Sequence, residues 1–205
     1  MKIAVVGAGK VGGALAAGWT RAGHDVVLGV REPDSEKTAA LLAGVPGLRA
    51  DTVGGSVRGA ETIVIAANPA AVRDIVEAMG DVSGKVIIDA MNSISTRPEP
   101  YTNTGDALLA WTNTRDVVKC FNTTGFENMA EPMYDGARID MFTAGDSKRG
   151  KQIAEQLARD LGFADCLDFG GNDKFELIEK FALCWINLAI MQGQGRNIAF
   201  KVLRR

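Results

Sequence analysis

Residues 2–12 read KIAVVGAGKVG and decide the fold of this chain. Lys2 to Val6 is a continuous, β-branched apolar run, which is typical of a strand covered on both faces of a parallel sheet. Val11 to Ala22 has the pattern of a helix, and Asp25 to Val30 reads as a second buried strand. Together these segments predict one βαβ unit over the opening 31 residues.

Strand-like and helix-like segments continue to alternate after this unit. Helices are predicted at Ala70 to Met79 and at Ser147 to Leu161, the second with Asp146 as its N-cap. Further strands are predicted at Thr62 to Ala66, Lys85 to Asp89, Asp116 to Cys120, Met141 to Ala144 and Ala164 to Asp168. This alternation predicts an α/β fold of the Rossmann type, with a doubly wound parallel sheet.

The run Gly170-Gly171-Asn172 marks the one seam in the chain. We expect residues 1–170 to form a dinucleotide-binding Rossmann domain and residues 171–205 to form a short helical extension packed on it. Within the extension, Asp173 to Met191 reads as one long apolar helix.

A glycine motif lies between the first strand and the first helix. Its order fits G-x-G-x-x-G, in which the first glycine permits a tight turn, the second lets a pyrophosphate approach, and the third permits close helix packing. The free N–H groups at the helix N-terminus would hold the phosphates. The motif predicts cofactor contacts at Gly7, Ala8, Gly9, Lys10, Val11 and Gly12.

The end of the second strand indicates which dinucleotide binds. An acidic residue there would bind the ribose of NAD, but Arg31 stands 19 residues after Gly12. Its guanidinium can pair with a 2′-phosphate, assisted by Ser35 and Lys37, so the sequence favours NADP. Glu32 keeps NAD open, because a shift of one residue would bring its carboxylate to the ribose.

Two later strand ends add candidate cofactor contacts, because open α/β sheets bind ligands at the carboxyl ends of their strands. Small residues there leave room for a ribose and a nicotinamide. An equally good interpretation is simple turn chemistry, since Asn-Pro and Asn-Ser are common turn formers. The candidates are Ala66, Ala67, Asn68, Pro69, Met91 and Asn92.

Composition argues against several classes of protein. The 23 basic and 25 acidic residues give a net charge of −2, and the basic ones are scattered, so no nucleic-acid partner is expected. The only histidine, His24, is expected in a solvated turn, which argues against a metal site and a Ser-His-Asp triad. No membrane span or secretion signal is visible, and three dispersed cysteines suit a cytoplasmic protein.

The ordered set of motifs resembles the deazaflavin-dependent NADP oxidoreductase family, the NADPH:8-hydroxy-5-deazaflavin (coenzyme F420) reductases and their bacterial relatives. The resemblance covers nearly the whole chain. The segments that carry it are Val5 to Gly9, Gly29 to Arg31, Asp89 to Asn92, the Phe-Asn-Thr-Thr-Gly run at 121–125, and Gly193 to Arg205.

The resemblance implies direct hydride transfer between a nicotinamide and a deazaflavin stacked face to face, with the protein supplying binding and orientation and no catalytic side chain. It implies that Asn122, Thr123 and Phe126 lie toward the second substrate. Two positions depart from the family: Val30 stands where relatives often have Ser, and Asn122 where deazaflavin reductases have His. The acceptor therefore stays open between a deazaflavin and a flavin.

Two other functions remain open. An NADP-dependent reductase of a small carbonyl or imine would need a proton donor at a strand end, and only Lys119 stands near one. A dinucleotide-binding redox sensor without turnover is the other, because a Rossmann fold does not prove catalysis. The apolar run Phe181 to Met191 is best explained as a core helix, and a homodimer with a shared cleft is the alternative that it leaves open.

Overall fold

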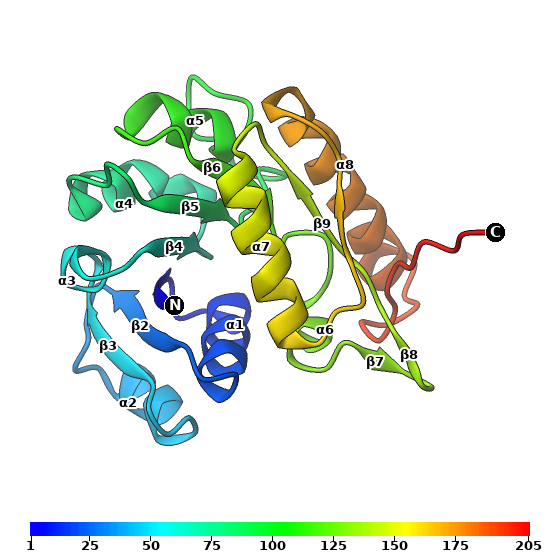
Figure 1. Ribbon diagram of the computed structural model, residues 1–205, viewed down its shortest axis with the longest axis horizontal. Coiled ribbons are helices and arrows are strands. Elements are labelled where there is room, and N and C mark those ends of the chain that lie inside the picture. The colour runs from blue at the N-terminus through cyan, green and yellow to red at the C-terminus, as the bar shows by residue number, and fades with distance from the viewer.

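The computed structural model describes residues 1–205 and has a central eight-stranded sheet in the order β10-β9-β6-β5-β4-β1-β2-β3 (Figure 1). Its strands are β1 (Lys2–Val6), β2 (Asp25–Val30), β3 (Arg49–Thr52), β4 (Thr62–Ile65), β5 (Val86–Asp89), β6 (Val117–Cys120), β9 (Met141–Ala144) and β10 (Cys166–Asp168). Strands β1 to β6 are all parallel and follow the doubly wound order. The predicted Rossmann-type α/β class is confirmed.

One strand pair departs from the predicted parallel sheet. Strand β9 runs antiparallel to β6, whereas β10 is parallel to β9. The chain reaches β9 through the short helix α6 (Phe126–Ala130) and a hairpin of β7 (Met133–Tyr134) and β8 (Ala137–Arg138). A connection of this kind can return the chain antiparallel, whereas the helix α7 (Lys148–Leu161) provides the crossover that parallel pairing requires.

Helices cover both faces of the sheet. One face carries α1 (Lys10–Arg21) and α7, which lie near the centre of Figure 1, and the other carries α3 (Val53–Arg58), α4 (Val72–Met79) and α5 (Thr104–Trp111), which lie toward its left. The first face buries a cluster of 25 apolar residues and the second a cluster of 14. The continuous apolar strands of the sequence are therefore explained by burial on both sides.

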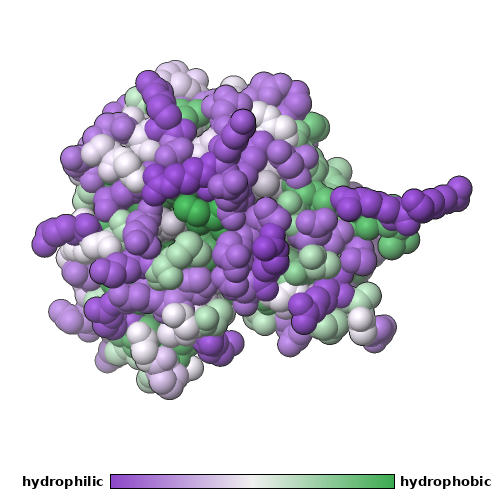
Figure 2. All heavy atoms as spheres, in the orientation of Figure 1, coloured by the Kyte–Doolittle hydropathy of each residue, from purple (hydrophilic) through white to green (hydrophobic).

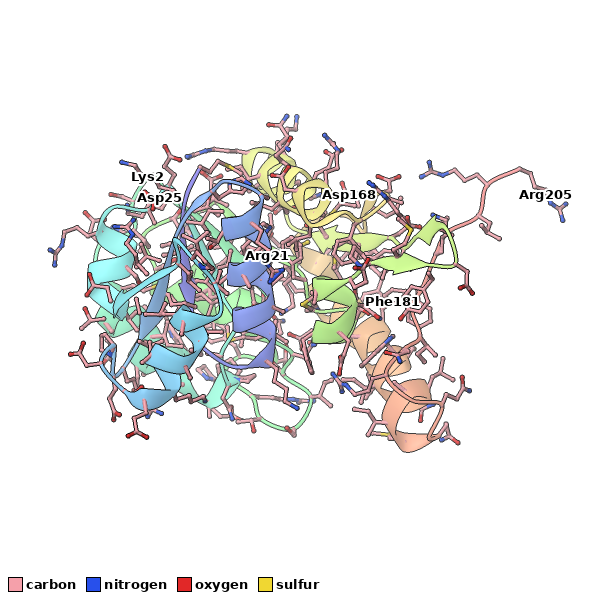
Figure 3. All side chains as sticks on the ribbon, turned by 90° about the horizontal axis from the view of Figure 1, so that it is seen from below. Lys2, Arg21, Asp25, Asp168, Phe181 and Arg205 are labelled. Atoms are coloured by element: carbon pink, nitrogen blue, oxygen red, sulfur yellow. The ribbon has the colours of Figure 1, made fainter.

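The C-terminal residues pack against β9, next to the β10 edge of the sheet. The predicted helix Asp173 to Met191 is divided into a 3-10 turn (Asn172–Lys174), α8 (Phe175–Ile186) and a π-helical turn (Asn187–Met191). Phe181 of α8, labelled in Figure 3, packs against Phe142 and Phe200, with ring centroids 4.8 and 4.7 Å away. The division into a domain of residues 1–170 and an extension of 171–205 stays a prediction.

Two local predictions are wrong. The N-cap of α7 is Ser147, whose Oγ accepts a hydrogen bond from the Gly150 N–H at 2.8 Å, while Asp146 accepts from the Asn172 N–H. His24 is not a solvated residue, because its side chain is only 10% exposed and its Nε2 lies 2.8 Å from Asp160 Oδ2. The sequence hides this contact because the two residues are 136 positions apart.

Several elements were not predicted, among them α2 (Glu36–Ala43), β3, α3 and α5. Strand β3 reads Arg-Ala-Asp-Thr and lies at the sheet edge, where charged side chains discourage pairing with another chain and remove the apolar signal. The surface in Figure 2 is mostly hydrophilic with scattered apolar patches. No helix has the length and apolar character needed to cross a membrane.

Candidate functional site

The glycine turn after β1 is shaped by close backbone contacts. Gly7 has φ +111°, and a Cβ on it would lie 2.4 Å from the Ala66 carbonyl oxygen. A Cβ on Gly12 would lie 1.9 Å from the Gly7 carbonyl oxygen, whereas a Cβ on Gly9 would meet nothing within 4 Å. Gly7 and Gly12 are therefore required by the fold, and Gly9 faces open space that a ligand can occupy.

The N-terminus of α1 is open to an anion. Its N-cap, Gly9, provides no side-chain cap, and its first turn contains no acidic residue. The first N–H groups of a helix have no partner within the helix, and the helix dipole favours negative charge beside them. The turn and the helix start together offer the geometry of a phosphate site.

A cleft of about 780 Å³ extends from this turn along the ends of β1 and β2. Arg31 and Lys37 line it, and neither makes an ion pair or a side-chain hydrogen bond within the protein, so both cations are free for a ligand. Glu32 and Asp74 also line the cleft. Ser35 is the N-cap of α2, where its Oγ accepts from the Thr38 N–H at 3.3 Å.

Eight of the predicted site residues line the cleft: Gly7, Ala8, Gly9, Arg31, Ser35, Lys37, Ala67 and Asn68. Asn68 also caps the 3-10 turn Pro69–Ala71, its Oδ1 accepting from the Ala70 N–H at 2.9 Å, so it forms the turn as well. The other ten do not line it: Lys10, Val11, Gly12, Ala66, Pro69, Met91, Asn92, Asn122, Thr123 and Phe126.

Eleven residues of the cleft wall were not predicted. Val6, Val30, Thr38 and Ala70 directly adjoin predicted residues, so a wider window around these positions would include them, and Glu32 was considered only as the alternative ligand of an NAD ribose. Asp74, Ile75 and Ala78 come from α4, and no motif marks them. The full unpredicted set is Val6, Gly29, Val30, Glu32, Thr38, Val53, Ala70, Ala71, Asp74, Ile75 and Ala78.

A second, smaller hollow of about 290 Å³ lies at the opposite end of the same strands. Lys2 and Asp25, which start β1 and β2 and are labelled in Figure 3, both line it. Ligands bind open α/β sheets at the carboxyl ends of the strands, so this hollow is not the candidate site.

Two amides join the ends of β5 and β6. Asn92 Nδ2 donates to the Asn122 carbonyl oxygen at 2.7 Å, and Asn122 Nδ2 donates to Asn92 Oδ1 at 3.0 Å. Asn122 Oδ1 is buried without a hydrogen-bond partner. The neighbouring side chains of Met91 and Thr123 are each only 2% exposed. Of the residues predicted here, the amides are brought together while Met91 and Thr123 pack inward.

The turn that presents Asn122 holds a strained residue. Phe121 has φ 60°, which is uncommon for a bulky side chain, and its ring packs edge-on against Trp19 with centroids 5.3 Å apart. Such a conformation costs on the order of 1–3 kcal/mol and persists where the surrounding structure imposes it. It redirects the chain after β6, which places the Asn122 amide beside Asn92.

Phe126, at the start of α6, has two cations near its ring. Lys10 Nζ is 5.2 Å from its ring centroid and Arg196 Cζ is 5.3 Å away. Arg196 also binds both carboxylate oxygens of Glu127. Burial alone would raise the pKa of Glu127, but the hydrogen bonds and charge of Arg196 lower it. Phe126 therefore connects the glycine turn with the C-terminal tail.

Lys119 lies in β6, as its sequence position suggested, and its side chain is fully buried. Its Nζ is 2.8 Å from Asp89 Oδ2 and donates to the Met91 carbonyl oxygen at 3.0 Å. An ammonium enclosed in this way cannot deliver a proton to a molecule in the cleft.

Comparisons with known proteins agree with this geometry. Residues 2–93 match the family described as NADP oxidoreductase coenzyme F420-dependent. A crystal structure of a candidate F420-dependent NADP reductase from Arthrobacter sp. FB24 is 26% identical, with a TM-score of 0.86 and full coverage of both chains. The predicted resemblance to this family is confirmed, and both findings support an oxidoreductase.

More distant structures share the fold. A hypothetical protein from Sinorhizobium meliloti is 21% identical, with a TM-score of 0.74 over 100% of this chain and 96% of its own. A Streptomyces aurantiacus imine reductase is 16% identical, with a TM-score of 0.69, and matches 94% of this chain but 64% of its own length. A search of curated proteins gave no match.

Proposed function

We propose that this protein transfers a hydride between NADP(H) and a deazaflavin or flavin-type redox cofactor. The observation that carries the proposal is the cleft at the carboxyl ends of β1 and β2, where an open helix N-terminus adjoins two unpaired cations. The family match over residues 2–93 and the likeness to the Arthrobacter protein support it.

The cosubstrate end is assigned from charge. The pyrophosphate would lie on the N–H groups of residues 8–12, and Arg31 with Lys37 would hold a 2′-phosphate in the cleft. Glu32 and Asp74 also line the cleft, and their distance from the phosphate would determine how strongly NADP is preferred over NAD.

The nicotinamide would lie beside Ala67, Asn68 and Asn92, and the acceptor would lie toward Asn122 and Phe126, whereas Thr123 packs inward. When bound, the nicotinamide supplies the hydride, which leaves with both electrons of its C–H bond, and a proton from solvent completes reduction of the acceptor. The protein binds and orients the two rings. Because Lys119 Nζ is enclosed by Asp89 and Met91, a carbonyl or imine acceptor lacks an evident proton donor.

An absorbance assay of NADPH oxidation tests the proposal. Purified protein is supplied in parallel with 8-hydroxy-5-deazaflavin and with FMN, and NADH replaces NADPH in a second set. We expect turnover with NADPH and the deazaflavin. Saturable NADPH binding without oxidation by either acceptor would contradict the proposal and favour a redox sensor.

A further inference from the structure

A buried ionic cluster lies beneath the carboxyl ends of β5 and β6. Lys119 Nζ is 2.8 Å from Asp89 Oδ2 and 2.7 Å from Glu179 Oε1. The side chains of Lys119 and Asp89 are fully buried and that of Glu179 is 9% exposed. The three charges come from β6, β5 and α8. Burying charges carries a large desolvation cost, so their positions relative to the site call for an explanation.

The hydrogen bonds of this cluster converge on one short backbone segment. The Met91 N–H donates to Asp89 Oδ1 at 2.9 Å, and Lys119 Nζ donates to the Met91 carbonyl oxygen at 3.0 Å. The Ser93 N–H donates to Glu179 Oε2 at 3.0 Å. Asp89 and Lys119 therefore bind the two backbone groups of Met91, before Asn92, and Glu179 binds the N–H of Ser93, after it.

The residue held in this way is Asn92, whose side chain exchanges two hydrogen bonds with Asn122. Ser93 is fixed a second time, because its Oγ accepts from the Thr104 N–H at 3.2 Å. A displacement of the Glu179 carboxylate would therefore be transmitted to the pair of amides through a single backbone link.

The charges of the cluster do not cancel. Burial alone would lower the pKa of Lys119, but Asp89 and Glu179 together raise it, so this side chain remains an ammonium. Burial raises the pKa of Glu179, the charge and hydrogen bond of Lys119 offset part of that effect, and the negative charge of Asp89 raises the pKa further. One ammonium therefore lies between two acidic side chains.

We propose that Glu179 is a positioning residue for hydride transfer, acting through Ser93 to hold Asn92 just after β5, beside the proposed position of the nicotinamide. This inference rests on the proposed function and extends it to α8, which otherwise lies outside the cleft. Glu179 contacts neither ring in this arrangement. Its effect is to fix the backbone beside which the nicotinamide would be oriented, and a misplacement of about 1 Å at such a position can slow a reaction on the order of 100-fold.

Three variants on the same helix test the proposal. Glu179→Asp shortens the side chain, so its carboxylate cannot reach both Lys119 and the Ser93 N–H. Glu179→Gln keeps the length and an oxygen that can accept from Ser93. Glu176→Gln is the matched control, since Glu176 is exposed and binds Thr102 Oγ1 rather than the 91–93 segment.

We expect Glu179→Asp to lower kcat about tenfold with the KM for NADPH within about threefold of wild type, because the phosphate end of the cleft is untouched. Glu179→Gln should restore most of kcat, and Glu176→Gln should match wild type. An unchanged kcat in Glu179→Asp, or a raised KM with unchanged kcat, would overturn the proposal. If Glu179→Asp does not fold, Glu179→Gln alone tests the proposal. A kcat about two- to threefold below wild type in Glu179→Gln would support the positioning role, and a kcat equal to wild type would overturn it.

The emission of the nicotinamide in bound NADPH gives a readout that needs no turnover. We expect this emission to differ from wild type in Glu179→Asp and to be unchanged in Glu176→Gln. If wild-type protein oxidises NADPH with neither acceptor, the proposed function fails, yet the emission still decides the positioning role. Identical emission in the wild type and Glu179→Asp would reject that role.

Discussion

The two ends of the candidate site are built in different ways. At the β1–α1–β2 end, backbone groups and exposed cations within 31 residues of one another form the site, and a ligand would complete it. At the β5–β6 end, the side chains that shape the site are buried and come from residues 30 to 86 positions apart. The first end is a local structure, whereas the second exists only once the whole fold has formed.

Of the changes that probe the two ends, removal of Lys119 should give the largest loss of stability. Lys119→Met leaves Asp89 and Glu179 buried without their cation, and breaking a buried ion pair in this way costs about 3–5 kcal/mol. We expect a loss of that size in the free energy of unfolding at pH 7, measured by urea denaturation. A loss below about 1 kcal/mol, the level of a surface ion pair, would mean that the cluster is not a structural unit.

The pH dependence of this effect has a defined sign. Because the pKa of Lys119 is raised above its ordinary 10.5, the stability it contributes is fully present below pH 10.5 and is lost as the pH rises through the raised value. The pKa of Glu179 is also raised, so acid should neutralise it early and reduce the deficit of Lys119→Met. A deficit that grows on acidification would contradict this charge assignment.

The glycine turn should give the next largest effect. Gly12→Ala places a Cβ 1.9 Å from the Gly7 carbonyl oxygen, so the backbone must shift. We expect a loss of about 3 kcal/mol in stability, at the upper end of overpacking costs, and loss of measurable NADPH binding. Gly59→Ala is the matched control, because its Cβ would meet nothing within 4 Å. Normal NADPH affinity in Gly12→Ala would contradict the assignment of the turn.

Substitution of Arg31 tests the preference for NADP over NAD and should have a smaller effect, on nucleotide affinity. Arg31→Ala removes a charge-assisted hydrogen bond of about 1.5–3 kcal/mol, so NADPH affinity should fall by about 10- to 100-fold while NADH affinity stays constant. Isothermal titration with both nucleotides measures this. Arg21→Ala, at the far end of α1 and labelled in Figure 3, should change neither affinity. Equal losses for both nucleotides would place the 2′-phosphate elsewhere.

The ion pair between Arg196 and Glu127 should matter least for stability. Both side chains are partly exposed, so Arg196→Ala should cost below about 1 kcal/mol in thermal unfolding. The pKa of Glu127 is lowered, so this contribution is present at neutral pH and is lost as the pH falls through the lowered value. A cost of several kcal/mol would mean that the C-terminal tail is part of the core.

The contrast also explains what the sequence could predict. Strands β1, β2 and β9 were predicted at both ends because each is a continuous apolar run, and Gly7, Gly9 and Arg31 were found because a strand–turn–helix motif fixes their spacing. The antiparallel direction of β9 could not be predicted, since the pattern of a fully buried strand is the same in either direction.

Side-chain partners over long separations were beyond prediction. Lys119 gave no sign that it would meet Asp89 and Glu179, because a lysine within an apolar strand does not identify its counter-ions. His24 likewise has the sequence context of a turn residue, and nothing near it in the sequence indicates its contact with Asp160. Met91 is a candidate because it follows a strand end, and Thr123 because of the family resemblance, but which way a residue points after a strand depends on turns such as that at Phe121.

Transfer of isotope from the nicotinamide to the acceptor tests the central claim most directly. NADPH carrying deuterium on one face of C4 is oxidised by the protein with the deazaflavin, and the products are analysed by mass spectrometry. Position 5 of a deazaflavin is carbon, so hydride delivered there is not exchanged with water. Direct transfer predicts that the deuterium from one face of NADPH appears in the reduced deazaflavin. Two results would contradict direct hydride transfer in this cleft. One is release of the deuterium to solvent, and the other is a reduced deazaflavin that carries no deuterium whichever face of the NADPH C4 is labelled.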